Sequence, residues 1–246
     1  EMRTLKVFGV LSLSSVVLPL TQRLTGSAIN AGNLTFVPVA NAVGAGYDSF
    51  GFSVNDGTLY SVASYTMTVD VTAANDAPTA ANNTVTTNED TDYVFTAADF
   101  NFADVDAGDT LASVEITSLE TAGSLELSGV AVTLNQVITV ADINAGNLTF
   151  VPVANANGAG YDSFGFSVND GTTDSAASYT MTVDVTAVAD APTAANNTVT
   201  TTEDTDYVFT AADFNFADVD AGDSLASVEI TTLEGVGALP VSGVEW

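Results

Sequence analysis

The 246-residue chain carries 31 acidic and 3 basic residues, a formal net charge of −28, and neither Cys nor His. It therefore lacks disulfides, thiolate or imidazole catalysis and the usual zinc ligands, and its acidity disfavours nucleic acid and anionic membranes as partners. Because 46% of the residues are hydrophobic, the composition indicates a folded core and not a disordered chain.

The first 28 residues hold all three basic residues of the chain. Residues 2–20 have the basic start and apolar middle of a signal peptide, but no clean small-residue cleavage site follows. Residues 7–17 align without a gap on residues 121–131, which favours a diverged copy of the same strands. No run in the chain is long and apolar enough to predict a membrane span.

An internal repeat dominates the sequence that follows. Residues 29–114 match residues 143–228 with eight differences over 86 positions, at an offset of 114 residues. Two periods and a remainder of 18 residues therefore make up the chain.

Within each period, short runs alternate apolar and polar residues and are separated by turn sequences such as "NDG", "NANG" and "DAGD". This pattern, rich in Val, Thr, Phe and Tyr, predicts an all-β fold of tandem antiparallel β-sandwiches with a period of 114 residues. "FTAADF" is compatible with a helical turn and no more. The expected strands lie at residues 93–95, 114–116, 125–127, 130–134, 148–153, 164–168 and 179–185.

Two Pro-containing links, residues 72–80 and 186–194, predict the domain boundaries, since a residue before Pro favours extended conformations. We expect one complete sandwich at residues 77–190. Residues 1–76 then form the C-terminal two-thirds of a preceding domain, and residues 191–246 the N-terminal half of a following one. The two incomplete ends either come from a longer array or complete one another between copies by strand complementation.

Acidic residues cluster where the chain turns. In "NFADVDAGDT", Asp104 and Asp106 point to one side of an extended segment, and Gly108 lets the chain turn so that Asp109 or a main-chain carbonyl approaches them. Oxygen ligands of this kind suit calcium, and no base is nearby to pair with them. A merely solvated acidic surface is the alternative, and Asp162 in "GYDSF" fits a strand cap as well as a ligand.

The stretches "NDAPTAANNTVTTNEDTDYVF", "DVDAGDTL" and "LTFVPVANANGAGYDSFGFSVNDG" resemble the bacterial cadherin-like tandem repeats of giant calcium-dependent surface adhesins, of the repeats-in-toxin type. The resemblance implies calcium at the domain junctions, where Glu89, Asp190, Asp218 and Asp220 would meet. The animal Leu-Asp-Arg-Glu element is absent, and the second link has Ala189 where the first has Asn75. The metal-ligand candidates are Asp104, Asp106, Asp109, Glu89, Asp170, Asn75, Asp76, Asp190, Glu203, Asp218, Asp220, Asp223 and Asp56.

The sequence therefore predicts an extracellular, calcium-stiffened structural or adhesive module on a bacterial cell surface. Its expected partners are neighbouring repeats, copies of the same chain and a surface ligand that the sequence does not identify. An enzyme is not expected, since the chain has no His or Cys and its carboxylates recur in turns of each copy. A module that binds carbohydrate or another surface ligand is the alternative.

Overall fold

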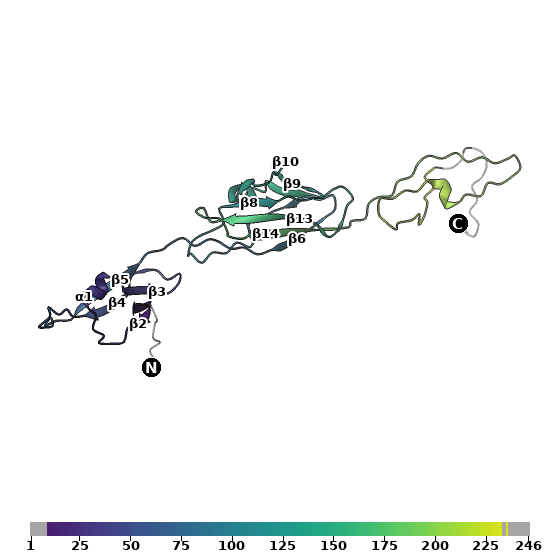
Figure 1. The fold of residues 1–246 in the computed structure, drawn as a ribbon. Helices are drawn as coiled ribbons and strands as arrows, with labels where there is room; N and C mark the ends of the chain where they lie inside the picture. Colours follow the sequence, from purple (N-terminus) through teal and green to yellow (C-terminus); the bar gives the residue numbers. More distant parts are fainter. Residues whose placement is uncertain (1–8, 233–234, 236–246) are drawn as a thin grey trace.

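The computed structural model describes residues 9–232 and Gly235 of the chain. Figure 1 shows three parts: the N-terminal segment (residues 9–76), the central sandwich (residues 77–190) and the C-terminal segment (residues 191–232). The all-β expectation is confirmed, because strands form nearly all the regular structure. The boundaries between the three parts stay a prediction. No helix of the described residues reaches the length and hydrophobicity of a membrane span.

Two sheets pack face to face in the central sandwich. The five-stranded sheet has the order β11 (Val137–Thr139), β8 (Ser113–Ser118), β13 (Gly158–Asn169), β14 (Tyr179–Thr186) and β6 (Asn83–Asn88). The four-stranded sheet has the order β10 (Val130–Ala131), β9 (Ser124–Leu127), β12 (Leu148–Val151) and β7 (Tyr93–Val94). Two short helices, η1 (Ala97–Phe100) and α2 (Val140–Asn144), fill the connections.

The β6–β14 pair differs from the antiparallel expectation, because these two strands run parallel, with Val85 beside Val183. Neither β6 nor β11 was expected as a strand, since the alternation in "NTVTTN" and "VIT" is short and rests on few apolar residues. The parallel pair has a consequence for the whole chain. The polypeptide enters the sandwich at one end, through β6, and leaves it at the other, through β14.

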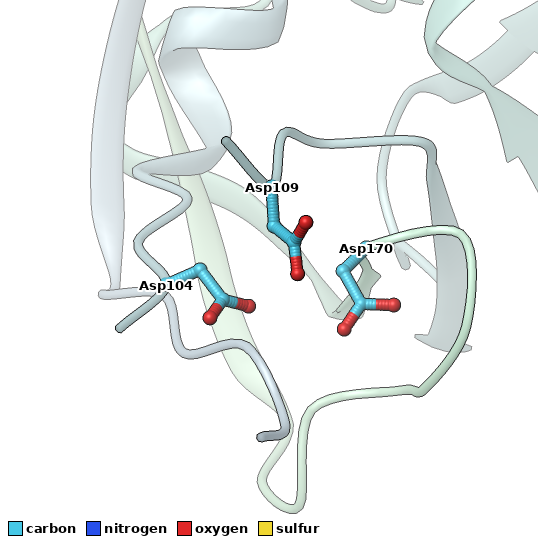
Figure 2. A group of neighbouring side chains, drawn as sticks. All are labelled: Asp104, Asp109 and Asp170. Atoms are coloured by element: carbon cyan, nitrogen blue, oxygen red, sulfur yellow. The ribbon is translucent and has the colours of Figure 1, made fainter. Parts of the chain in front are cut away.

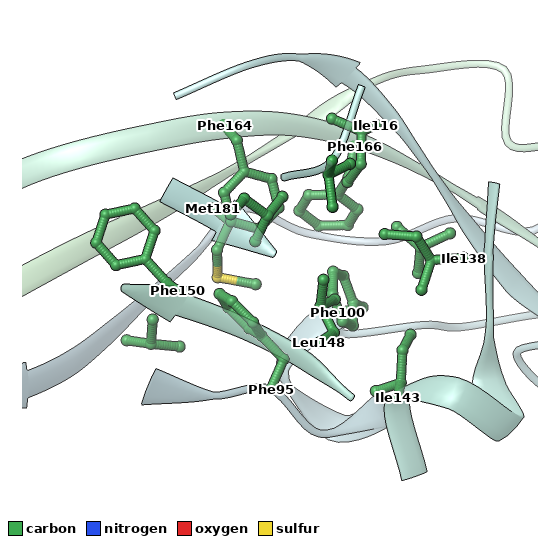
Figure 3. Close-up of a cluster of buried hydrophobic side chains, with 14 of the residues drawn as sticks. Phe95, Phe100, Ile116, Ile138, Ile143, Leu148, Phe150, Phe164, Phe166 and Met181 are labelled. Atoms are coloured by element: carbon green, nitrogen blue, oxygen red, sulfur yellow. The ribbon is translucent and has the colours of Figure 1, made fainter. Parts of the chain in front are cut away.

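The core lies between the two sheets and contains the side chains that alternate inward along the strands (Figure 3). Every buried hydrophobic residue of the described chain lies between Val85 and Val185. Edge-to-face ring pairs join the first half of the domain to the second: Phe95 to Phe164 at 5.5 Å and Phe100 to Phe166 at 5.1 Å. The central sandwich is thus held by contacts that neither half makes alone.

The N-terminal segment contains β1 (Gly9–Leu13), β2 (Val16–Val17), α1 (Gly26–Asn30), β3 (Leu34–Pro38), β4 (Gly44–Phe52) and β5 (Tyr65–Val71). Its sheets are β2-β1-β3 and the β4–β5 hairpin. Each of β2, α1, β3, β4 and β5 begins 114 residues before β10, α2, β12, β13 and β14 respectively (16 to 130, for example). Gly9–Leu13 and Val16–Val17 are thus strands where the repeat predicts them, and residues 1–8 lie outside the described residues.

The C-terminal segment has one 3-10 helix, η2 (Ala211–Phe214), and an isolated bridge between Thr193 and Ala217. Residues 197–202, 207–208 and 227–232 correspond to β6, β7 and β8 but form no strands. Their pairing partners β14, β12 and β13 have no counterpart in the described part of this segment, and an unpaired strand is not stable alone.

Candidate metal centre

Three carboxylates face one another at the end of the central sandwich where the N-terminal link arrives. Oxygen atoms of Asp104, Asp109 and Asp170 all lie within 4.8 Å of one another (Figure 2). Asp104 and Asp109 come from the loop between η1 and β8, and Asp170 comes from the loop between β13 and β14. The first loop is anchored by the Thr79–Ala103 bridge and turns at Gly108, whose φ of +108° favours glycine.

Part of the hydrogen-bonding capacity of this cluster is unused. Asp104 Oδ1 accepts from the backbone N–H of Asp106 at 2.8 Å, whereas its Oδ2 is buried and has no hydrogen-bond partner. A buried carboxylate oxygen without a donor is costly unless a cation or water binds it. Asp170 Oδ1 accepts from the N–H groups of Thr172 and Thr173. The donor set, all oxygen and negatively charged, fits a hard divalent cation.

The pKa shifts in the cluster also reflect a concentration of negative charge. Desolvation, followed by the charges of Asp104, Asp106 and Asp170, raises the pKa of Asp109 above its ordinary value. The side-chain amide of Asn75, followed by backbone N–H groups, lowers the pKa of Asp170. No Lys or Arg follows residue 23, so no basic side chain of the central sandwich offsets these charges.

The N-terminal link is attached directly to this end of the sandwich. The N–H of Asp76 donates to Asp106 Oδ2 at 2.7 Å, and Asn75 Nδ2 donates to Asp170 Oδ2 at 3.0 Å. Asp106 therefore faces the link, and it is absent from the three-carboxylate cluster that the sequence suggested it would join. In its place Asp170, which is distant in the sequence, completes the group.

The second junction has a similar cluster of three acids, but here Asp220, the counterpart of Asp106, is one of its members. Oxygen atoms of Asp218, Asp220 and Asp223 lie within 4.8 Å of one another, all from the loop after η2. The N–H of Asp190 donates to Asp220 Oδ2 at 2.7 Å. Desolvation, followed by the charges of Asp220, Asp90, Glu89 and Asp218, raises the pKa of Asp190. The charges of Glu89, Asp218 and Asp220 therefore all act on Asp190, the fourth acid expected at this junction.

Glu89 has a different role from that of an exposed ligand. It is 3% exposed; its Oε2 accepts from Asn157 Nδ2 at 2.8 Å and its Oε1 accepts from the N–H of Val188 at 2.6 Å. These donors lower its pKa, with Asn157 first. Glu89 thereby fastens the end of β6 to the link that follows β14.

Sequence reasoning missed the asparagines beside this junction. The N–H of Asn155 donates to Asp90 Oδ1 at 3.0 Å, and with its amide nitrogen turned toward the acids its side chain reaches Asp190 and Asp90. The sequence pattern "NANG" was interpreted only as a turn. One signal was available: Asn157 is among the eight repeat differences, with Val43 in the earlier copy.

Asp56 and Glu203 are two further candidates that belong to neither cluster. Asp56 caps its own turn by accepting from the N–H groups of Thr58 and Leu59, which lower its pKa. Glu203 is exposed, unlike its counterpart Glu89. Asp162, the suspected strand cap, accepts from the N–H groups of Thr121, Ala122 and Ser163 and is buried. The assignment of the ligands stays a prediction.

The sequence model of the cadherin-like domain family matches residues 74–186. No curated protein and no solved structure matches the chain significantly. Residues 74–186 therefore form a cadherin-like domain, which covers the central sandwich to the end of β14 and contains the first acidic cluster. Such a domain indicates an adhesive or structural extracellular module, is typically not an enzyme, and usually binds calcium.

Proposed function

We propose that the chain is a calcium-stiffened structural and adhesive module of a bacterial surface adhesin or filament. One observation carries this proposal. Asp104 Oδ2 is buried without a hydrogen-bond partner, beside Asp109 and Asp170, at the point where the link binds the same loops. A cation at this point would bind the loops together and, through them, hold the link.

The first site would use Asp104, Asp109 and Asp170 as ligands, with Asn75 and Asp106 fixing the link beside it. The second site would use Asp218, Asp220 and Asp223, with Asp190 and Glu89 nearby. The bound ion supplies positive charge that the chain does not provide in these regions. Backbone N–H groups already orient the carboxylates of Asp104, Asp170, Asp218 and Asp220.

The topology supports a role in a linear array. Because β6 and β14 run parallel, the two links leave from opposite ends of the sandwich, roughly 26 Å apart for the eight residues of β14. Each additional repeat therefore adds length. Without cations, repulsion between acids at a junction favours bending; with them, the junction is neutralised and straightens.

Small-angle X-ray scattering and thermal unfolding of the full chain, with calcium and with chelator, test the proposal. An ion that binds only the folded state adds about 2.7 kcal/mol at a hundredfold excess over its Kd. We expect calcium to raise the Tm and to lengthen the maximum dimension, and magnesium to act less because it prefers a smaller octahedral shell. Identical scattering profiles and melting curves in calcium and chelator would refute calcium stiffening.

A further inference from the structure

The loop before β13 contains the single Asn-Gly pair of the chain, Asn157 and Gly158. Such a pair is chemically labile, because the backbone nitrogen that follows Asn can attack the side-chain carbonyl carbon, and glycine has no Cβ to shield that nitrogen. The earlier copy of the repeat has Val43 before Gly44. The two copies of this loop therefore differ in whether they can react in this way.

The surroundings of the pair leave room for the reaction. Asn157 is exposed, so water reaches its amide, and nothing lies within 4 Å of the place that a Cβ would take on Gly158. Gly158 is the first residue of β13, and the register of β13 with β14 shifts between Gly158 and Asp162. Continuous pairing begins only at Asp162, so the backbone at Gly158 is held less tightly than the rest of the strand.

The labile amide is also the group that holds Glu89 in place. Asn157 Nδ2 donates to Glu89 Oε2 at 2.8 Å, and Glu89 is 3% exposed. The other oxygen of the same carboxylate, Oε1, accepts from the N–H of Val188 in the second link at 2.6 Å. One buried carboxylate therefore connects the loop before β13 to the second link.

The charged neighbours of this loop are acidic. The N–H of Asn155 donates to Asp90 Oδ1 at 3.0 Å, and the side chain of Asn155, with its amide nitrogen turned toward the acids, reaches Asp190 as well. No Lys or Arg follows residue 23 of the chain. A further carboxylate at position 157 would therefore face Glu89 with no basic side chain of the central sandwich to offset it.

We propose that Asn157 is a site of spontaneous deamidation, and that its conversion loosens the attachment of the second link to the central sandwich. The nitrogen of Gly158 attacks Asn157 Cγ, the Cγ–Nδ2 bond breaks, and ammonia leaves with the proton of the Gly158 N–H. Water then opens the resulting succinimide. Opening at Cγ gives aspartate, and opening at the main-chain carbonyl carbon gives isoaspartate, in which the chain runs through Cγ.

Either product disturbs the buried carboxylate of Glu89. The donor to Glu89 Oε2 is lost, and a like charge takes its place beside this oxygen. Both changes disfavour the present position of Glu89, since a buried carboxylate is costly without its hydrogen bonds and more so beside another anion. When Glu89 moves, its hydrogen bond from the N–H of Val188 is lost too. The link is then held by fewer contacts.

Peptide mapping by mass spectrometry tests the modification on the full chain, incubated in metal-free, mildly alkaline buffer. We expect Asn157 to gain the mass difference between an amide and an acid, in two forms that separate chromatographically, with release of an equal amount of ammonia. Asn155 and Asn41 are internal controls from the same loop and its earlier copy, because each is followed by Ala. They should convert several-fold more slowly. Conversion of Asn157 at the rate of these controls would overturn the proposal.

Limited proteolysis of the second link with elastase, in chelator, tests the consequence. Asn157→Asp mimics one product, whereas Asn157→Gln keeps an amide that must close a larger ring to react. We expect Asn157→Asp and incubated wild type to be cut within residues 186–194 several-fold faster than fresh wild type. The rate for Asn157→Gln should not rise with incubation. Cutting within the first link, residues 72–80, should stay constant throughout and serves as the reference.

Two outcomes would contradict the coupling between Asn157 and the second link. The first is equal cutting of that link in Asn157→Asp and fresh wild type. The second is a rise with incubation in Asn157→Gln that equals the rise in wild type, which would assign the change to another residue. Incubated wild type repeats the comparison on a chain that folded before it reacted.

The deamidation does not depend on calcium. Because the mapping and the proteolysis are both carried out without metal, their results stand apart from the scattering and melting experiments that test calcium stiffening. A chain that stiffens with calcium but keeps Asn157 unchanged refutes only the modification.

Discussion

The backbone N–H of Asp76 donates to Asp106 Oδ2 at 2.7 Å, and this hydrogen bond fixes the direction in which the link joins the central sandwich. The same contact recurs at the second junction, between Asp190 and Asp220, also at 2.7 Å. In both cases the carboxylate belongs to the loop that also presents the metal-ligand candidates. An ion bound to that loop would therefore act on the link through this carboxylate, and at the first junction also through the hydrogen bond from Asn75 to Asp170.

Asp104→Asn should weaken calcium binding at the first site. The substitution removes the negative charge and replaces one carboxylate oxygen with an amide nitrogen, which does not bind a cation. It therefore weakens a ligand whose Oδ2 is buried without a hydrogen-bond donor. We expect roughly a tenfold to hundredfold loss of affinity for the first site, by analogy with the loss of supporting groups at metal sites. Isothermal titration calorimetry measures it, with Glu126→Gln on β9 as a charge-matched control. Equal affinity in the two variants would contradict the assignment of Asp104.

Asn75→Ala should loosen the first junction and leave the second unchanged. Asn75 Nδ2 joins the link to Asp170 and to Thr173, whereas the second link has Ala189 at this position. Loss of the amide also removes the main cause of the lowered pKa of Asp170. Limited proteolysis should cut the first link several-fold faster in the variant. The reciprocal change Ala189→Asn should not affect that rate, and a response of both links would show that the effect is not local.

Asp162→Ala should destabilise the central sandwich whether or not calcium is present. Its buried carboxylate accepts from three backbone N–H groups, those of Thr121, Ala122 and Ser163, which would be left without partners. Leaving these buried N–H donors without an acceptor costs about 2–4 kcal/mol in total. Urea unfolding in chelator measures the loss. Asp162→Asn, which keeps one acceptor oxygen for these N–H groups, should cost less than Asp162→Ala.

The stability of the calcium-free chain should rise as the pH falls from neutral to mildly acidic values. The pKa of Asp109 and that of Asp190 are raised in the fold, so the fold binds these protons more tightly than the unfolded chain does. Below about pH 4 the trend should reverse, because the pKa values of Glu89 and Asp170 are lowered and their ionised forms are the stabilising ones.

Urea titrations across this range in metal-free buffer measure the profile. The double variant Asp109→Asn and Asp190→Asn should flatten the rise between neutral and mildly acidic pH. With calcium present the slope should invert, because protons compete with the ion for the same oxygens. A calcium-free chain whose stability falls steadily from pH 7 downward would contradict the repulsion assigned to these two acids.

Much of the fold was predictable, because period-two alternation locates most strands of the central sandwich. β8, β9, β12, β13 and β14 lie where the pattern places them. β6 was not predicted, since "NTVTTN" has a single strongly apolar residue, Val85. Its role as a parallel partner of β14 depends on a contact about 98 residues away in sequence, Met181 with Asn83, which no local pattern encodes.

The residue types of the candidate site were predicted from the sequence, but which of these residues come together was predicted only in part. The "DVDAGD" turn is visible in sequence because three acids alternate around a glycine. That Asp170 joins Asp104 and Asp109 while Asp106 turns to the link depends on how two loops meet at the end of the sandwich.

The sequence alone determined which residues repeat, where acids gather and which side chains are apolar enough to form a core. Tertiary structure decided whether a segment with few apolar residues forms a strand. "NTVTTN" at residues 83–88 is strand β6, whereas "NTVTTT" at residues 197–202 is not a strand. The physical reason is that backbone N–H and C=O groups need a partner strand, and residues 197–202 have no counterpart of β14 beside them among the described residues.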